Sequence, residues 1–374
     1  MTIDLKEVKT KSDLRKFINF PLKLYRNNPF YVPALQGDEF KTLSTSSNPA
    51  FEYCKARYWL AYKDNKIAGR IAAIVNQRHI DKWKQPFMRF GWLDFVDDYE
   101  VSKALIKAVE DWARELGLDA VHGPLGFTNL DREGMLVEGF NELATLATSY
   151  NYPYYPQHLE QLGYRKDMDY VEYEITIPSE SNQKISKIAE IALKRNNLTL
   201  FIPKTKADLL VYARECLTLM NDEYSHIYGT ISLTDKQINA YIDQYFGLIN
   251  PQYTSVILNQ EGKLIAFGIT MPSLSKAAQK CKGKLFPLGW FLILRDLKKN
   301  DRADLLLVAV KKEYQGLGVP ITLINQIGTF FLQHGIKLAE SNPEMETNLN
   351  VQSQWQFFDS RQHKRRRVFI KFLN

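Results

Sequence analysis

A short loop near the C-terminal end of the chain has the residue types and spacing of an anion-binding site. Residues 305–310 are all apolar and predict a buried strand, and an amphipathic helix follows Gly318. Gln315, Gly316 and Gly318 lie in the connecting loop. Because N–H groups at a helix start lack partners and the helix dipole is positive there, the loop predicts a phosphate or pyrophosphate site. A plain strand-to-helix turn that requires small residues is the alternative.

The whole arrangement resembles the acyl-CoA loop of the GNAT (GCN5-related N-acetyltransferase) superfamily. Its pattern is Arg or Gln, two residues, Gly, one residue, then Gly or Ala, and Gln315 and Gly318 match it. Pro320 departs from the last position, but proline is tolerated in the first turn of a helix. The resemblance implies acetyl-CoA or another acyl-CoA as the cofactor. The cofactor-binding residues it implies are Val308, Ala309, Val310, Gln315, Gly316, Leu317, Gly318, Val319 and Asn348.

Composition and charge place the chain among globular proteins with anionic partners. It has 374 residues, a formal net charge of +7 and a sequence pI near 9.0, which favour CoA, nucleic acid or a membrane surface. The basic run 364–367 leads into apolar residues, so it is interpreted as the solvated start of a strand and not as a nucleic-acid patch. Three well-separated cysteines indicate a reducing cytoplasm, and six histidines without ligand spacing indicate no metal. No apolar run is long enough to span a bilayer.

The order of predicted elements occurs twice along the chain, which indicates an internal duplication. In the first half the order is a hairpin (57–75), a strand (90–96), a helix (101–116), a short strand (118–122), a helix (156–163) and a strand (169–175). In the second half it is a hairpin (254–271), a strand (304–310), a helix (321–331), a short strand (336–340), a helix (351–358) and a strand (368–373). Gly117 and Gly335 end the two longer helices as C-caps.

This order of elements is also that of the GNAT fold, so the chain resembles a tandem GNAT protein over most of its length. The fold class expected is α/β (α+β), with two GNAT-like domains, each a mixed, mostly antiparallel sheet flanked by helices. The polar turn at 178–182 separates residues 1–178, a degenerate domain, from residues 179–374, the domain with the acyl-CoA loop.

The two halves differ at the loop that would hold the cofactor. In place of glycines the first half has Asp97, Asp98 and Glu100, which complement a helix N-terminus and would repel a pyrophosphate. CoA is therefore expected in the second half alone. The first half is expected to complete the substrate cleft or to stabilise the second domain.

In the first half, a glycine-rich, polar stretch follows the short strand. The resemblance to GNAT proteins implies that the loop after this strand faces the substrate cleft. The substrate-site candidates are Asn129, Tyr150, Asn151, Tyr154 and Tyr155 in the first half and Tyr224 in the second. The alternative is that these tyrosines pack the domain and that the glycines shape turns. The sequence is consistent with both interpretations.

Acyl transfer from a thioester to an amine requires a base, a donor that polarises the carbonyl, and an acid for the thiolate. Glu340, at the end of the predicted strand 336–340, is the candidate base, and a solvated strand end is the alternative. The resemblance to GNAT proteins implies that backbone N–H groups near Val308–Val310 polarise the thioester carbonyl and that Asn348 contacts the CoA arm. The tyrosine that usually protonates the thiolate is absent from residues 351–358, so water, Tyr224 or Tyr228 would replace it.

The function predicted is an acyl-CoA-dependent N-acyltransferase, with acetyl transfer to a small amine or amino-acid-like substrate as the leading case. A transferase of the Fem or lysyl-transferase type that uses aminoacyl-tRNA, and an inactive GNAT-like binding protein, are the alternatives. The expected partner is a small-molecule amine, with no metal, no membrane span and no nucleic acid. The acceptor, the acyl chain length and the oligomeric state stay open.

Overall fold

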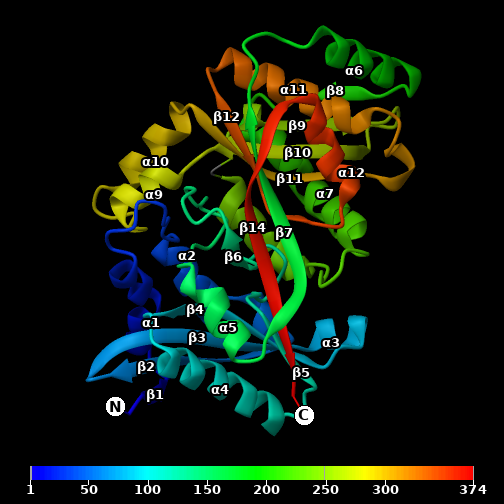
Figure 1. Ribbon diagram of the computed structural model, residues 1–374. Coiled ribbons are helices and arrows are strands. Elements are labelled where there is room, and N and C mark those ends of the chain that lie inside the picture. The colour runs from blue at the N-terminus through cyan, green and yellow to red at the C-terminus, as the bar shows by residue number, and fades with distance from the viewer. Residues whose placement is uncertain (1, 248, 374) are drawn as a thin grey trace.

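A computed structural model describes residues 2–247 and 249–373 (Figure 1). Its strands form one continuous 14-stranded sheet with the order β1-β2-β3-β4-β5-β14-β7-β12-β11-β10-β9-β8, while β6 pairs with β14 and β13 pairs with β7. Two neighbouring pairs are parallel, β4 with β5 and β11 with β12, and the others are antiparallel. The expected fold class, a mixed and mostly antiparallel sheet flanked by helices, is confirmed.

The first half of the chain supplies one end of this sheet and the helices that cover it. Its elements are β1 (Asp4–Glu7), α1 (Lys11–Leu24), α2 (Gln36–Leu43), β2 (Cys54–Lys63), β3 (Lys66–Asn76), α3 (Gln77–Trp83), β4 (Phe87–Phe95), α4 (Tyr99–Glu115), β5 (Ala120–Gly123), β6 (Met135–Glu138), α5 (Tyr154–Gln161) and β7 (Arg165–Thr176).

The second half supplies the other end, with its last strand reaching back across the molecule. Its elements are α6 (Gln183–Arg195), β8 (Thr199–Phe201), α7 (Lys206–Tyr224), α8 (Asp235–Tyr241), β9 (Thr254–Leu258), β10 (Leu264–Pro272), α9 (Ser275–Cys281), α10 (Gly289–Lys298), β11 (Arg302–Val310), α11 (Val319–Gln333), β12 (Leu338–Ser341), β13 (Glu344–Met345), α12 (Leu349–Gln352) and β14 (Asp359–Phe372).

The last strand of each half lies beside the other half's strands. β7 pairs with β12, and β14 pairs with β5 through the register Phe369↔Gly123 to Phe372↔Ala120. β7 and β14 also pair with each other over most of their length, which makes the long central ladder of Figure 1. The two ends of the sheet are therefore joined by main-chain hydrogen bonds. A domain boundary near residue 178 stays a prediction.

The basic run 364–367 differs from its expected exposure. Lys364 and Arg366 are 1% and 0% exposed, and both reach the buried carboxylate of Glu172 on β7. Strand alternation places these two side chains on one face of the sheet. The run is thus part of a buried ion-pair network and not a solvated strand start.

The helices that cover the sheet follow from local sequence signals. The Asp98 side chain accepts a hydrogen bond from the Glu100 N–H and caps α4, whose buried stripe includes Val101, Leu105 and Val109. α11 begins after Gly318, which has a positive φ of 80°, and carries a proline in its first turn. Across residues 2–247 and 249–373, no helix has the length and apolar character needed to cross a lipid bilayer.

The parallel pair β11–β12 separates part of the way along. The two strands are in register from Arg302↔Leu338 to Leu305↔Ser341, and β12 then ends while β11 continues to Val310. On its other side β11 has an irregularity, because Leu307 and Leu305 face Ile269 and Thr270 and leave Leu306 without a partner. The backbone of β11 beyond Leu305 therefore borders an opening in the sheet.

Candidate functional site

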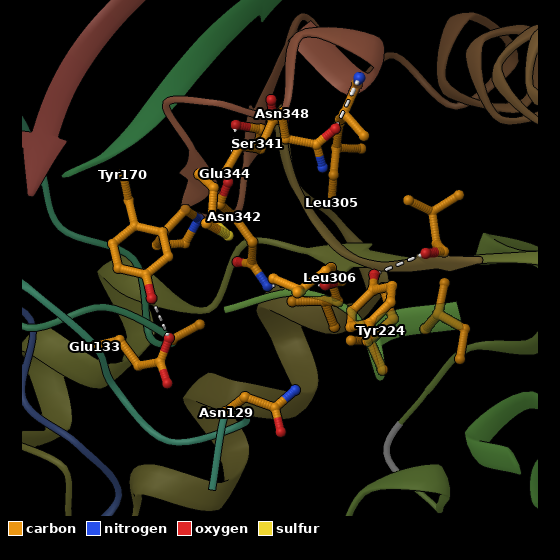
Figure 2. Close-up of a pocket in the computed structure, with 18 of the residues that line it drawn as sticks. Asn129, Glu133, Tyr170, Tyr224, Leu305, Leu306, Ser341, Asn342, Glu344 and Asn348 are labelled. Carbon is orange, nitrogen blue, oxygen red and sulfur yellow. Dashed lines mark hydrogen bonds between the residues drawn. The ribbon is translucent and has the colours of Figure 1, made fainter. Parts of the chain in front are cut away.

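The opening beside β11 leads into a cavity of about 360 Å³, a size typical of small-molecule sites. Its lining comes from β11, α11, the segment between β12 and α12, the start of β7, the end of α7, and the loop after β5. Figure 2 shows side chains from these segments facing one another across the cavity. Residues from both halves of the chain thus enclose one site.

One part of the cavity wall is apolar. Strand β11 and helix α11 line it on either side of the opening, and the last residues of β7 continue the wall. The apolar lining residues from these elements are Leu305, Leu306, Leu307, Val308, Leu323, Ile324, Ile327, Phe331, Ile175 and Ile177. Such a wall favours a hydrocarbon chain over a charged group, because apolar surface gains free energy when it leaves water.

The first half also contributes polar groups to the lining, from the loop after β5 and the start of β7. Tyr170 donates a hydrogen bond to Glu133 over 3.0 Å, and both residues line the cavity (Figure 2). Burial raises the pKa of Glu133 to about 7. Burial lowers the pKa of His122, whose Nδ1 lies 3.7 Å from Asp167 Oδ2. Asn129 also lines the cavity, and its buried Oδ1 has no hydrogen-bond partner in the described chain. These groups could bind hydroxyl or amine groups of a ligand.

Glu344 supplies another carboxylate of the lining, on β13 close to the opening. The Trp355 indole N–H donates to its two oxygens at 3.0 and 3.2 Å. Burial raises the pKa of Glu344 to about 7. A carboxylate with this pKa is ionised in about half the molecules at neutral pH, which suits a general base.

The edge of β11 at the opening carries two side-chain contacts. Asn342 donates through its amide to the Leu306 carbonyl over 2.8 Å, and Tyr224 donates through its hydroxyl to the Val308 carbonyl over 2.7 Å (Figure 2). Burial raises the pKa of Tyr224 to about 12, so its hydroxyl stays protonated at neutral pH. Tyr224, one of the predicted substrate residues, therefore lies at the strand that borders the opening.

The glycine loop between β11 and α11 has backbone N–H groups that can donate hydrogen bonds to a ligand. Gly316 and Gly318 both have φ near 80°, and a Cβ built on Gly316 meets open space. Within the described chain, no partner is found for the N–H groups of Gly316, Gly318 and Val319. The Glu223 carboxylate holds the loop from the other side, since it accepts from the Lys312 N–H and the Gln315 side chain, each at 3.1 Å.

The predicted cofactor residues divide between these two places. Val308 and Asn348 line the cavity, while Ala309 and Val310 are buried in the adjoining cores. Asn348 also caps α12 by accepting from the Val351 N–H over 3.4 Å. Gln315, Gly316, Leu317, Gly318 and Val319 form the loop and the start of α11. The assignment of these residues to cofactor binding stays a prediction.

The predicted substrate residues are not all brought together. Asn129 and Tyr224 line the cavity, but the four candidates between residues 150 and 155 do not. Tyr150 donates to the Phe140 carbonyl, and Asn151 bonds to the backbone of Leu136. Tyr154 donates to the Phe95 carbonyl over 2.6 Å, and the Tyr155 hydroxyl accepts from the Phe95 N–H over 2.9 Å. Their polar groups are used in packing the first half.

The predicted base, Glu340, faces away from the cavity. Its neighbour Ser341 lines the cavity, and strand alternation puts the Glu340 side chain on the other face of β12. There the Lys364 ammonium pairs with Glu340, and His363 Nε2 lies 3.4 Å from the same carboxylate. Ligand atoms of Glu172, Glu340 and His363 lie within 4.8 Å of one another, as in a metal site. Because Lys364 pairs with both carboxylates, we interpret this group as an ion-pair network.

Several residues that line the cavity were not predicted as site residues from the sequence. Glu133, Tyr170, Asn342 and Glu344 are scattered over three segments and match no motif of fixed spacing. One signal was present, because Asn342-Pro343-Glu344 follows a short strand directly, where polar residues gather around sites. Nothing in the sequence marks Glu133 or Tyr170, since they come from separate segments, the connection between β5 and β6 and the strand β7.

Comparisons with known proteins relate the chain to two curated proteins and to GNAT structures. No family model matches the chain. Protein YghO of Escherichia coli is 27% identical over 372 residues, 96% of this chain and 93% of that protein. A protein named bacterial ceramide synthase from Caulobacter vibrioides is 27% identical over 324 residues, 82% of this chain and 80% of that protein.

Among solved structures, a tandem GNAT protein from the clavulanic acid biosynthesis pathway is similar with a TM-score of 0.56. Its sequence is 11% identical, and the match covers 99% of this chain and 98% of that one. At this identity the likeness establishes the fold and not the substrate. The chain therefore has the GNAT N-acetyltransferase fold over its whole length, shared with a tandem GNAT protein.

Proposed function

We propose that the protein is an acyl-CoA-dependent N-acyltransferase that transfers a long acyl chain to the amino group of an amphipathic substrate. The observation that carries the proposal is the cavity at the β11–β12 opening, which is apolar along β11 and α11 and has polar groups from the loop after β5 and the start of β7. The GNAT fold supports acyl transfer in general. The relative named bacterial ceramide synthase supports a long-chain amine as the acceptor and a fatty acyl group as the donor.

The glycine loop supports CoA binding in the second half. A pyrophosphate would accept hydrogen bonds from the free N–H groups of Gly316, Gly318 and Val319 at the positive end of α11. Bound there, the acyl-CoA would supply the acyl group as a thioester. Glu223 would hold the loop open from behind through Lys312 and Gln315.

The lining residues supply the acid and the base in this proposal. Glu344 accepts the proton that the amine loses as the C–N bond forms, since burial has brought its pKa to about 7. The backbone of β11 near Val308 polarises the carbonyl, and the C–S bond breaks. Tyr224, whose hydroxyl lies at the Val308 carbonyl, gives its proton to the departing thiolate and is reprotonated from solvent.

The polar groups of the first half would select the acceptor. Glu133, Tyr170 and the unpartnered Oδ1 of Asn129 could bind hydroxyl or amine groups near the reacting nitrogen. Polar groups left unpaired by a substrate without such groups would cost binding free energy. An acceptor with an amine and a neighbouring hydroxyl is therefore expected to react faster than a simple alkylamine.

The test is a direct assay of thiol release. The purified protein is incubated with CoA thioesters of two to eighteen carbons and with a long-chain amino alcohol, and free CoA and the amide product are measured. Release that depends on the amine and increases with acyl length supports the proposal. Equal or faster transfer from acetyl-CoA to short amines would contradict the long-chain assignment. Thioester hydrolysis without any amide would contradict N-acyl transfer itself.

A further inference from the structure

The segment from α9 to α10 exposes an unusual group of large apolar side chains. Phe286 is 80% exposed, Leu288 72% and Phe291 57%, and Leu285, Trp290 and Leu294 are also exposed. They lie in the connection between α9 and α10 and along one face of α10, at the outer edge of the molecule in Figure 1. We call this group the α9–α10 patch. Contiguous exposed apolar groups of this kind mark interaction surfaces.

The same segment concentrates the positive charge of the chain. Residues 275–300 contain seven Lys or Arg and one Asp, which gives +6, whereas the whole chain carries +7. The six lysines, Lys276, Lys280, Lys282, Lys284, Lys298 and Lys299, are all exposed. No salt bridge is found for any of them within residues 2–247 and 249–373, and Asp296 pairs with Arg295. The charge is therefore available to an anionic partner.

The patch is held firmly on the protein. Ile293 and Leu274 are buried against Leu35 on the inner side. The Gln36 N–H donates to the Gly283 carbonyl over 2.9 Å, and a Cβ built on Gly283 would lie 2.1 Å from the Ala34 carbonyl oxygen. The inner face of the segment thus packs on the first half, while the outer face has no protein partner among the described residues. Its exposure is a feature of the fold.

We infer that the α9–α10 patch binds the surface of an anionic lipid bilayer. Apolar and aromatic side chains rimmed by lysines are the arrangement of elements that lie in the membrane interface, with the rings at headgroup depth and the ammonium groups on lipid phosphates. The proposal does not depend on the acyltransferase assignment. It would, however, bring the protein to the membrane in which long-chain substrates reside.

Vesicle co-sedimentation tests the inference. We expect the wild-type protein to pellet with vesicles of phosphatidylcholine and phosphatidylglycerol, less with phosphatidylcholine alone, and less again as salt is raised. The double variant Phe286→Ser/Trp290→Ser should lower the partition coefficient at least ~10-fold, and Lys282→Glu/Lys284→Glu should abolish the preference for the anionic lipid. Because all four side chains are exposed, thermal unfolding should change little.

Matched controls separate the patch from general stickiness. Val211, 68% exposed on α7, gives the apolar control Val211→Ser, and Lys184→Glu/Lys187→Glu on α6 gives the charge control. Both controls should bind vesicles as the wild type does. The inference is overturned if the wild type stays in the supernatant with anionic vesicles, or if patch and control variants bind alike. It is also overturned if the wild type is a dimer in solution that the patch variants convert to monomer.

Discussion

The two halves of the molecule use the same strand arrangement with opposite results. In the first half, β4 and β5 are parallel from Phe87↔Ala120 to Arg89↔His122, as β11 and β12 are in the second. Beyond that point the chain after β5 turns inward, and the Leu125 N–H donates to the Phe90 carbonyl over 2.8 Å. A Cβ on Gly91 would lie 2.6 Å from the Leu125 carbonyl oxygen. The first opening is filled by the protein's own backbone, while the second leads into the cavity.

The helices that connect the two strands of each parallel pair, α4 and α11, differ in the same way. The N-terminus of α4 is occupied by Asp98, which accepts from the Glu100 N–H and pairs with Lys63. The N-terminus of α11 begins at Gly318, which has no side chain to fill the position. One half is thus closed by its own groups at both the strands and the helix. The second half leaves both positions free, and these free positions are the ones that the proposed function assigns to the acyl-CoA.

The strongest test of the open half is Glu344→Gln. We expect the turnover number to fall ~10²–10⁴-fold, because the amide keeps the shape of the side chain and removes the carboxylate that we propose as the base. In the wild type, the rate should fall as pH drops below about 7, where Glu344 becomes protonated, and the variant should lack this dependence. Steady-state rates across pH measure both effects.

A carboxylate whose pKa is raised by folding also affects stability. For Glu344 the contribution to stability is full below its unfolded value of 4.5 and is lost as pH rises through about 7. Glu344→Gln should therefore be more stable than the wild type at pH 8, by at most about 3 kcal/mol. Glu340→Gln is the matched control. A large loss of rate in that variant, with folding intact, would return the base to Glu340.

The contrast between Glu340 and Glu344 shows where prediction from sequence stops. The predicted strand 336–340 and the observed β12, Leu338–Ser341, differ by only a residue or two at each end. In a strand, neighbouring residues point to opposite faces, so the choice of carboxylate depends on an orientation that a four-residue strand does not reveal. Element types such as β11 and α11 were predictable because their apolar periodicity is strong.

The exchange of the last strands between the halves could not be predicted from local sequence signals, for a different reason. The pairing of β7 with β12, and of β14 with β5, joins segments far apart in the chain, and tertiary packing decides it. The tyrosines from Tyr150 to Tyr155 were ambiguous likewise, since an aromatic ring suits a core and a pocket equally. Their hydrogen bonds to backbone groups of the first half became visible only in the structure.

Lys364→Met tests the seam between the halves. The Lys364 side chain is 1% exposed and pairs with Glu172 and Glu340, so its removal takes the ammonium away from Glu340 and leaves Glu172 with Arg366 alone. We expect the free energy of unfolding to fall by about 3–5 kcal/mol. Lys194→Met, which breaks an exposed pair with Glu190, should cost less than about 1 kcal/mol. Urea unfolding compares the two.

The opposite result at this seam would be informative. If Lys364→Met is as stable as Lys194→Met, Arg366 and His363, or a bound ion, must compensate the two carboxylates. Glu172, Glu340 and His363 have the spacing of a metal site, so elemental analysis of the variant would then be the next measurement. A bound metal would replace our interpretation of the ion-pair network.

Gly318→Asp tests the open helix terminus. The new side chain would sit at a φ of 80°, with its Cβ 3.0 Å from the Ala192 Cβ, and its carboxylate would occupy the position where a pyrophosphate is proposed. We expect the dissociation constant for CoA to rise at least ~100-fold by calorimetry. Gly117→Asp carries a similar φ penalty at an open position of the first half and should leave CoA affinity unchanged.

Tyr224→Phe is expected to have the smallest effect, and it probes the acid at the open strand edge. The change removes only the hydroxyl that donates to the Val308 carbonyl over 2.7 Å, and the ring still fills its place in the cavity wall. If Tyr224 protonates the thiolate, the turnover number should fall about 10-fold while KM stays near the wild-type value, with water as the replacement acid. Tyr228 also lines the cavity, and its hydroxyl donates to Asp167 over 3.3 Å. Tyr228→Phe removes this hydroxyl and should lower the rate less than Tyr224→Phe does. The decisive measurement uses donors with different thiol leaving groups, because loss of an acid harms the poorer leaving group more. Equal losses for good and poor leaving groups would mean that the Tyr224 hydroxyl positions β11 and does not protonate the thiolate.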